Sequence, residues 1–219
     1  MSVGRPPTAA GAPEPSQGRG PTGTPQPWLV RADDSPQQPW KNGGGTMREL
    51  LVWPPGEHWH ARVGVAEIAA DGPFSDFPGI ERWFLVLEGA GVELTVRGAS
   101  GAAAHRITRI DPPLQFDGGA PTTCRLLDGP AQALNLMLRG ARGGIETVCD
   151  AEPWAPPRDA GTACGVFSAV AGHCNGIALP SHALLWFDAA PPQLTFVAAE
   201  RPAGAVGWWF TATPLEAAP

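Results

Sequence analysis

The sequence has few charged residues and no cluster of basic ones. Asp, Glu, Lys and Arg make up 16% of its 219 residues, the formal net charge is −6, and no run of Lys or Arg occurs. A protein that binds nucleic acid presents a basic face to the phosphates. We therefore expect no direct contact with nucleic acid.

Long apolar segments are also missing. No apolar run approaches the roughly 18 residues that a membrane-spanning helix needs, and the stretch from Met1 to Pro27 lacks the apolar core of a secretory signal. The cysteines form no C-x-x-C pair, so we expect them to be small buried hydrophobic residues; they are Cys124, Cys149, Cys164 and Cys174. These absences favour a cytoplasmic protein that does not contact a membrane.

Glycine and proline are abundant, with 28 and 26 residues, and they gather in two kinds of place. The first is the segment 1–27, which cannot bury enough apolar surface to offset its chain entropy and is expected to be a disordered tail. The second is a series of short turns between apolar segments. Hydrophobic residues make up 43% of the chain, so residues 28–219 are expected to fold as one domain with a substantial core.

The apolar segments are short, and several alternate with a period of two, which predicts strands rather than helices. Trp83–Leu87 is an uninterrupted apolar run, typical of a strand buried on both faces. With the turn at Glu88–Gly91 and the strand Val92–Val96, it predicts a β-hairpin. Other expected strands are Trp28–Val30, Arg62–Ile68, His105–Ile110, Pro113–Phe116, Cys124–Leu127, Ala133–Leu138, Leu184–Phe187, Leu194–Val197 and Val206–Phe210. The pattern predicts an all-β barrel or sandwich.

Three consecutive glycines, Gly43 to Gly45, follow Lys41 and Asn42. Their backbone N–H groups can approach a ligand closely, and the same residues suit a tight hairpin turn with Lys41 in solvent, so both interpretations remain open. The segment is not a phosphate-binding loop, because its lysine precedes the glycines.

A second segment, Asp71–Arg82, combines two phenylalanines with Pro and Gly turns and leads into the buried strand. This order would place Arg82 at the mouth of a barrel. The alternative is an ordered surface loop in which Arg82 pairs with Glu81 or Glu49. Asn135, within an apolar strand, needs a hydrogen-bond partner, which is either the core or a ligand.

His58-x-His60 raises the question of a metal site. Cupin enzymes hold their metal with His-x-His, a Glu a few residues later and a further His. Here the next acid is Glu67, and Pro54-Pro55 precedes the pair where a strand should run. We expect no metal and no other cofactor.

Three stretches resemble the HutD/Ves family of the cupin superfamily. They are Trp40–Thr46 with Arg48-Glu49, Gly72–Gly79 with Glu81-Arg82, and Thr123-Cys124 with Asn135–Met137 and Arg139. The resemblance implies a cupin-like (RmlC-type) double-stranded β-barrel, expected to be a compact bicupin, without the cupin metal ligands. It also implies a sensor or regulator of histidine utilisation. The resemblance further implies a ligand pocket formed by Lys41, Asn42, Thr46, Glu49, Phe77 and Arg82.

The chemistry of these residues suits a small anionic or amide-bearing metabolite. Arg82 can hold a carboxylate through two parallel N–H···O bonds, and Lys41 adds a point charge. The ligand expected from the resemblance is urocanate or a formimino, formyl or other small carboxylate intermediate. The full predicted set is Lys41, Asn42, Gly43, Gly44, Thr46, Glu49, Phe77, Arg82 and Asn135.

Two alternatives to a binding protein stay open. A metal-independent cupin enzyme could use Glu49 as base, with Lys41 or Arg82 stabilising an oxyanion. A protein-interaction barrel would have a pocket without a ligand. Cupins often dimerise through edge strands, which by analogy favours a homodimer.

Overall fold

The computed structural model describes residues 26–40, 43–202 and 204–215, and every regular element within these ranges is a β-strand. The expected tail before Gln26 lies outside the described residues. Because these elements are all strands, the all-β prediction is confirmed. The described ranges contain no helix that could span a membrane.

The first half of the molecule consists of two sheets. Its larger sheet has the order β2-β3-β4-β11-β6-β9, and its smaller sheet has the order β5-β10-β7-β8. The strands are β2 (Gln37–Pro39), β3 (Gly45–Trp53), β4 (Ala61–Ile68), β5 (Gly72–Pro73), β6 (Ile80–Glu88), β7 (Val92–Gly98), β8 (Gly101–Ile107), β9 (Leu114–Asp117), β10 (Thr122–Leu126) and β11 (Ala131–Arg139).

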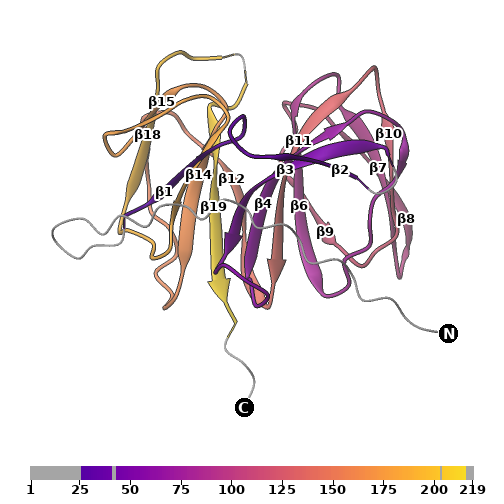
Figure 1. Ribbon diagram of the computed structural model, residues 1–219, viewed down its shortest axis with the longest axis horizontal. Coiled ribbons are helices and arrows are strands. Elements are labelled where there is room, and N and C mark those ends of the chain that lie inside the picture. The colour runs from indigo at the N-terminus through magenta and orange to yellow at the C-terminus, as the bar shows by residue number, and fades with distance from the viewer. Residues whose placement is uncertain (1–25, 41–42, 203, 216–219) are drawn as a thin grey trace.

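The second half repeats this arrangement. One sheet has the order β1-β17-β14-β19-β12, and the other has the order β13-β18-β15-β16. The strands are β1 (Trp28–Arg31), β12 (Ala141–Thr147), β13 (Pro153–Trp154), β14 (Ala163–Ser168), β15 (Gly172–Cys174), β16 (Ile177–Leu179), β17 (Ala183–Phe187), β18 (Leu194–Ala198) and β19 (Gly207–Pro214). The N-terminal β1 pairs with β17, so it belongs to the second half in space (Figure 1).

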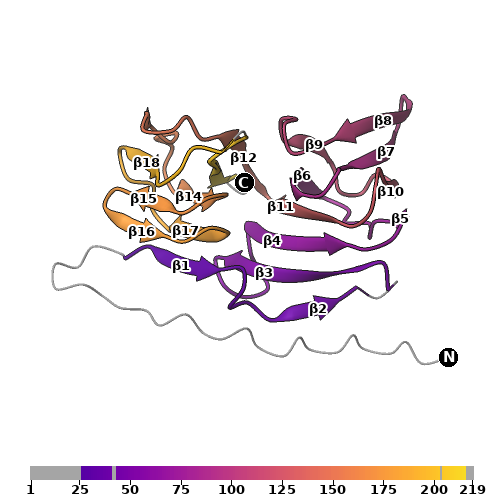
Figure 2. The ribbon, with the colours of Figure 1, turned by 90° about the horizontal axis from the view of Figure 1, so that it is seen from above.

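Three hydrophobic cores hold these sheets together, and the halves lie side by side (Figure 2). One core fills the first half, another fills the second half, and the third lies between the two larger sheets. Strand alternation explains how one strand serves two cores. On β11, Leu134, Leu136 and Leu138 face the second half, whereas Ala133 and Asn135 face the interior of the first half.

Trp83–Leu87 forms the centre of β6 and is buried on both faces, as expected: Phe84 and Val86 enter the first-half core, and Leu85 and Leu87 enter the core between the halves. The predicted hairpin is wrong, because β6 pairs with β9 and β11, while β7 pairs with β8 and β10. The turn carries the chain from one sheet to the other. Gly89 has φ +93° there, and a Cβ on it would lie 2.5 Å from the Pro130 carbonyl oxygen.

Two further expectations need correction. The strand expected over His105–Ile110 ends at Ile107, because the Asp111 carboxylate accepts hydrogen bonds from the Thr108 backbone N–H and hydroxyl and closes a turn. All four cysteines are free, and Cys124, Cys164 and Cys174 are buried, but Cys149 is exposed.

Candidate functional site

Arg82 lies inside the first half, between its two sheets. Its side chain points inward from β6, next to Phe84 of the first-half core, and the residue is only 6% exposed. Three phenyl rings surround the guanidinium, with centroids 5.1 Å (Phe74), 5.5 Å (Phe77) and 5.1 Å (Phe116) from its central carbon. Burial lowers the pKa of Arg82 to about 10, so the group is still a cation at neutral pH.

The hydrogen-bonding capacity of this buried cation is only partly used. One terminal nitrogen donates to Asn135 Oδ1 at 3.2 Å, and Nε has no acceptor in the described part of the chain. No ion pair of Arg82 occurs among the described residues. The expected alternatives, Glu81 and Glu49, are engaged elsewhere: Glu81 accepts from the Trp83 indole at 2.8 Å and Glu49 binds Arg62. An unpaired buried cation is costly, and an anion would relieve that cost.

Glu49 and Arg62 form an ion pair on the same inner surface. Arg62 Nε donates to Glu49 Oε2 at 2.9 Å, and a terminal nitrogen of Arg62 donates to the same oxygen. Strand register fixes their place, because directly paired residues point to the same face of a sheet. Met137 pairs with both Arg62 and Arg82, and Gly64 pairs with both Glu49 and Asn135.

Trp59 covers the end of this region. Its ring lies 5.4 Å from the Arg62 guanidinium carbon and 4.5 Å from that of Arg139. Arg139 also donates from Nε to the Trp59 carbonyl at 3.0 Å and from a terminal nitrogen to the Glu57 carbonyl. These contacts fix the loop between β3 and β4 over the end of the barrel that holds Arg82.

The structure brings three of the predicted residues into contact, since Arg82 contacts both Asn135 and Phe77. Glu49 shares their face of the larger sheet but pairs with Arg62. The structure does not bring the glycine turn to them. Ala69 and Ala70 donate backbone bonds of 3.0 and 3.2 Å to the Gly44 carbonyl, beside the Ile68 end of β4. Arg62 stands near the other end, about 20 Å away at roughly 3.3 Å per strand residue. Gly43, with φ +71°, shapes the turn between β2 and β3. Lys41 and Asn42 lie outside the described residues.

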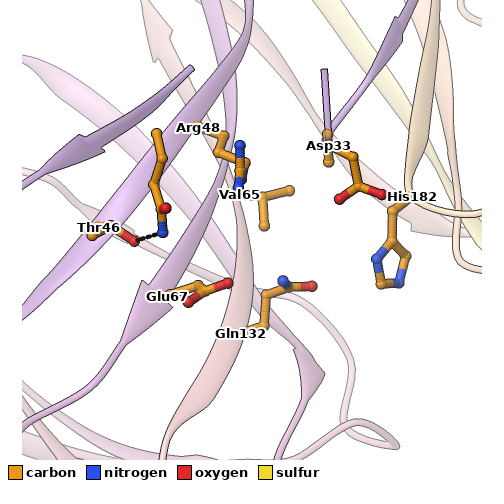
Figure 3. A pocket seen from close by; sticks show the side chains of 9 residues that line it. Asp33, Thr46, Arg48, Val65, Glu67, Gln132 and His182 are labelled. Atoms are coloured by element: carbon orange, nitrogen blue, oxygen red, sulfur yellow. Dashed lines mark hydrogen bonds between the residues drawn. The ribbon is translucent and has the colours of Figure 1, made fainter. Parts of the chain in front are cut away.

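Thr46 occupies the opposite face of β3 from Glu49. It accepts a 2.6 Å hydrogen bond from Gln37 Nε2 and lines a polar cavity of about 50 Å³ with Arg48, Glu67, Gln132 and His182 (Figure 3). A larger cavity, of about 580 Å³, lies where residues 109–112 meet residues 147, 148 and 150 and residues 201, 202, 204–206 and 208. None of the predicted residues lines it.

The residues inside the first half do not fit a cupin metal. Two guanidinium groups, one paired carboxylate and one amide stand there, and cationic neighbours oppose a metal ion. Among the described residues, no group of three His, Cys, Asp or Glu side chains could hold a metal ion. His60 instead lies 3.1 Å, through Nδ1, from the Arg139 carbonyl.

Sequence reasoning missed Phe74, Phe116 and Arg62. Phe74 stood in a segment that the sequence singled out, but its ring could be placed only once the loop was known. Phe116 comes from β9 and pairs in register with Arg82. Arg62 sits two residues before Gly64 in an alternating strand, so the period of two already placed it on the face opposite Val63 and Val65.

Comparison with known proteins identifies the fold and the family. A family model described as HutD matches residues 32–201. The chain belongs to the HutD family. The prediction from sequence is confirmed on this point.

Curated relatives match over part of their length. The uncharacterized 21.2 kDa protein in the hutC 3′ region of Pseudomonas putida is 35% identical over 113 residues, which are 50% of this chain and 56% of that protein. Protein Ves of Citrobacter koseri is 37% identical over 105 residues, 47% of this chain and 53% of that protein. The chain thus spans about half the length of the curated relatives that it matches.

Solved structures match over most of the chain. HutD from Pseudomonas fluorescens SBW25 has a TM-score of 0.71 and 27% identity, covering 85% of this chain and 98% of that one. A conserved protein of unknown function from Pseudomonas aeruginosa PAO1 has a TM-score of 0.65 and 27% identity, covering 85% and 97%. Oxalate decarboxylase of Bacillus subtilis, at 10% identity and a TM-score of 0.61 over 94% and 81%, shares the fold alone. The cupin-like fold is confirmed, and its assignment as a bicupin stays a prediction.

Proposed function

We propose that this HutD-family protein binds a small carboxylate inside its first half and serves as a sensor or regulator in histidine utilisation. One observation carries the proposal: Arg82 is buried, positively charged and without a counter-ion in the described part of the chain, and its Nε–H has no acceptor. A carboxylate would supply both the missing charge and the missing acceptor.

The surroundings of Arg82 suit such a ligand. Asn135 uses its oxygen to accept from Arg82, which leaves its Nδ2 hydrogens directed away from that bond, so the amide can donate to a ligand oxygen. The three phenyl rings hold the guanidinium in one orientation and exclude water, which strengthens charge-assisted hydrogen bonds. The site can therefore offer two neighbouring N–H donors to one carboxylate.

The relatives support the choice of metabolite class. The Pseudomonas putida relative lies in the hutC 3′ region, and the Pseudomonas fluorescens HutD structure was obtained in a formate condition. We therefore place urocanate and formyl or formimino compounds first among the candidate ligands, with formate as the smallest carboxylate probe.

Calorimetric titration tests the proposal with formate, urocanate and N-formylglutamate on the wild type and on Arg82→Lys. Lysine keeps the charge and loses the two-pronged donor, so we expect affinity to fall roughly tenfold or more. Arg125→Lys is the matched control, since Arg125 is an exposed arginine of the same half, paired with Glu93 at 3.2 Å. No binding of any probe to the wild type, or equal affinity in Arg82→Lys, would overturn the proposal.

The enzyme alternative has less support. It assigned the role of base to Glu49 and the stabilisation of an oxyanion to Lys41 or Arg82, but Glu49 pairs with Arg62, and no contact joins it to Arg82 in the described part of the chain. A base must lie within hydrogen-bonding reach of the proton that it takes from the bound substrate. Turnover of urocanate, followed by its ultraviolet absorbance during the same titrations, would favour the enzyme instead.

A further inference from the structure

The cavity of about 580 Å³ lies where the two halves of the molecule meet. Its volume is within the range of pockets that hold small molecules, and such pockets often lie at domain interfaces. The first half contributes the turn from Arg109 to Pro112, and the second half contributes the end of β12, the start of β19 and the loop before it. Arg82 does not line this cavity, so a ligand here occupies a site of its own.

The second half gives the cavity an apolar wall, formed by Val148, Val206 and Trp208. The two valines belong to the core of the second half and Trp208 belongs to the core between the halves, so the cavity opens where these cores reach the surface. Trp208 pairs with Thr147 of β12, and directly paired residues point to the same face of a sheet. A molecule with an apolar body would release water from this wall.

Ile110 lines the same cavity from the first half. It is 83% exposed, more than any other large hydrophobic residue that the structure describes. Its turn is fixed, because Asp111 Oδ2 accepts hydrogen bonds from the Thr108 backbone N–H at 2.8 Å and hydroxyl at 2.6 Å, and the Asp111 N–H donates to the Thr108 carbonyl at 3.2 Å. A ligand that covers Ile110 and the apolar wall together gains from both burials.

Four charged side chains line the cavity, and three of them are engaged. Asp111 accepts the two hydrogen bonds within its own turn, and Arg201 Nε donates to Asp150 Oδ2 at 2.8 Å. Arg109 has no hydrogen bond or ion pair among the described residues. An exposed arginine without a partner is ordinary by itself. Beside an apolar wall, it gives the cavity a preference for an anionic group.

We infer that this cavity is a second binding site, for a small amphipathic molecule with an apolar body and one anionic group. The apolar body lies between Ile110 and the apolar wall, and the anionic group accepts hydrogen bonds from the Arg109 guanidinium. Such a molecule contacts both halves at once. The inference is independent of carboxylate binding at Arg82, because the two sites share no residue.

Two fluorescent probes with the same rings test the inference: 8-anilinonaphthalene-1-sulfonate, a monoanion, and N-phenyl-1-naphthylamine, its uncharged analogue. Both brighten when they leave water for an apolar site, so fluorescence titration measures both affinities. We expect the wild type to bind the sulfonate saturably, and more tightly than the neutral probe. Arg109→Gln should weaken the sulfonate about fivefold, the effect of one exposed charge-assisted contact, and leave the neutral probe unchanged.

Ile110→Ala should weaken both probes several-fold, because both lose the same apolar contact. Arg97→Gln is the matched control for charge, since Arg97 is an exposed arginine of β7 that does not line the cavity. Val197→Ala is the matched control for apolar surface, since Val197 is 46% exposed and also lies outside the cavity. Both controls should keep both affinities. All four positions are exposed, so thermal unfolding of the variants should match that of the wild type.

Three results would overturn the inference. The cavity is not the site if sulfonate binding does not saturate, or if Ile110→Ala leaves both affinities unchanged. The preference for an anion is wrong if Arg109→Gln leaves the ratio of the two affinities as it is in the wild type. If Arg82→Lys weakens the sulfonate and Arg109→Gln does not, the probe binds inside the first half. That last result would support the proposed function while removing this second site.

Discussion

The two halves share an arrangement of paired sheets but differ in what they place between them. The second half packs an apolar cluster between its sheets, and the buried polar side chains near it are uncharged, such as the Thr162 and Thr213 hydroxyls, which lie 2.8 Å apart. The apolar cluster consists of Val148, Cys164, Val166, Cys174, Leu179, Leu185, Leu194, Phe196, Val206 and Trp209. The first half has a similar apolar core at one end, and Arg82, Asn135, Glu49 and Arg62 at the other. Polar groups inside a sheet sandwich cost stability unless they are satisfied. The difference supports the proposal that the first half binds a ligand, whereas the second half mainly contributes stability.

The largest effect should come from opening the apolar core of the second half. Phe196 is fully buried, and Phe196→Ala should lower the free energy of unfolding by about 3–5 kcal/mol, from lost burial and the cavity that remains. Chemical denaturation measures the change.

The neighbouring Val197 serves as control, since it is 46% exposed and Val197→Ala should change stability by less than about 0.5 kcal/mol. Carboxylate affinity of the folded Phe196→Ala protein should equal that of the wild type. A parallel loss of affinity would mean that the second half shapes the site.

Arg82→Met should have the opposite effect, with a large loss of carboxylate affinity and a small change in stability. It removes the buried guanidinium while keeping an apolar stem against the three rings, so we expect carboxylate affinity to fall at least about a hundredfold. Stability should change less than in Phe196→Ala, because the lost contacts with Asn135 and the rings are offset by the removal of an unpaired buried charge.

Denaturation and calorimetry on the same sample give both quantities. A stability loss equal to that of Phe196→Ala, with affinity retained, would make Arg82 a structural residue and remove the contrast between the halves.

A smaller effect is expected from the backbone that supports Arg82. A Cβ on Gly118 would lie 2.7 Å from the Ile80 carbonyl oxygen and 3.1 Å from Arg82 Cδ. Gly118→Ala should therefore displace the arginine stem, weaken carboxylate binding several-fold and cost about 1–3 kcal/mol of stability.

Gly72→Ala is the control, because a Cβ there meets nothing within 4 Å although β5 leads directly into Phe74. Equal affinity in Gly118→Ala and the wild type would show that the position of Arg82 tolerates a shift.

The sequence was informative about features that depend on one strand alone, such as where a strand lies and which of its faces is buried. Alternation located β4, β6 and β11, and the composition around Arg82 indicated the mouth of a barrel, whereas the structure buries this residue inside the first half. The sequence was misleading about features of the fold that depend on which strands pair. The turn after Glu88 looks like a hairpin locally, but Gly89 and Gly91 serve a change of sheet, which only the approach of residues 107 and 130 reveals.

The same limit applies to the site. Thr46 and Glu49 lie three residues apart on β3 and therefore on opposite faces, and the glycine turn lies beyond the far end of the strand. Phe116 comes to Arg82 only through the pairing of β9 with β6, and Arg62 shares the face of Arg82 only through the pairing of β4 and β6 with β11. Resemblance groups residues by motif, whereas the sheet register decides which of them share a surface.

The smallest effect should come from Thr46→Val, which tests whether binding is confined to the interior of the first half. The change removes the hydroxyl that accepts from Gln37 Nε2 at 2.6 Å, a solvent-exposed contact, so the free energy of unfolding should fall by less than about 1 kcal/mol. Carboxylate affinity should stay within about twofold of the wild type, because Thr46 and Arg82 share no partner among the residues that the structure describes and lie on opposite faces of the sheet. Calorimetry with the strongest probe decides the matter. A tenfold loss of affinity would show that the ligand contacts the face between the two halves, where Thr46, Arg48 and Glu67 line the small polar cavity. The binding site would then lie at the junction of the halves and not within the first half.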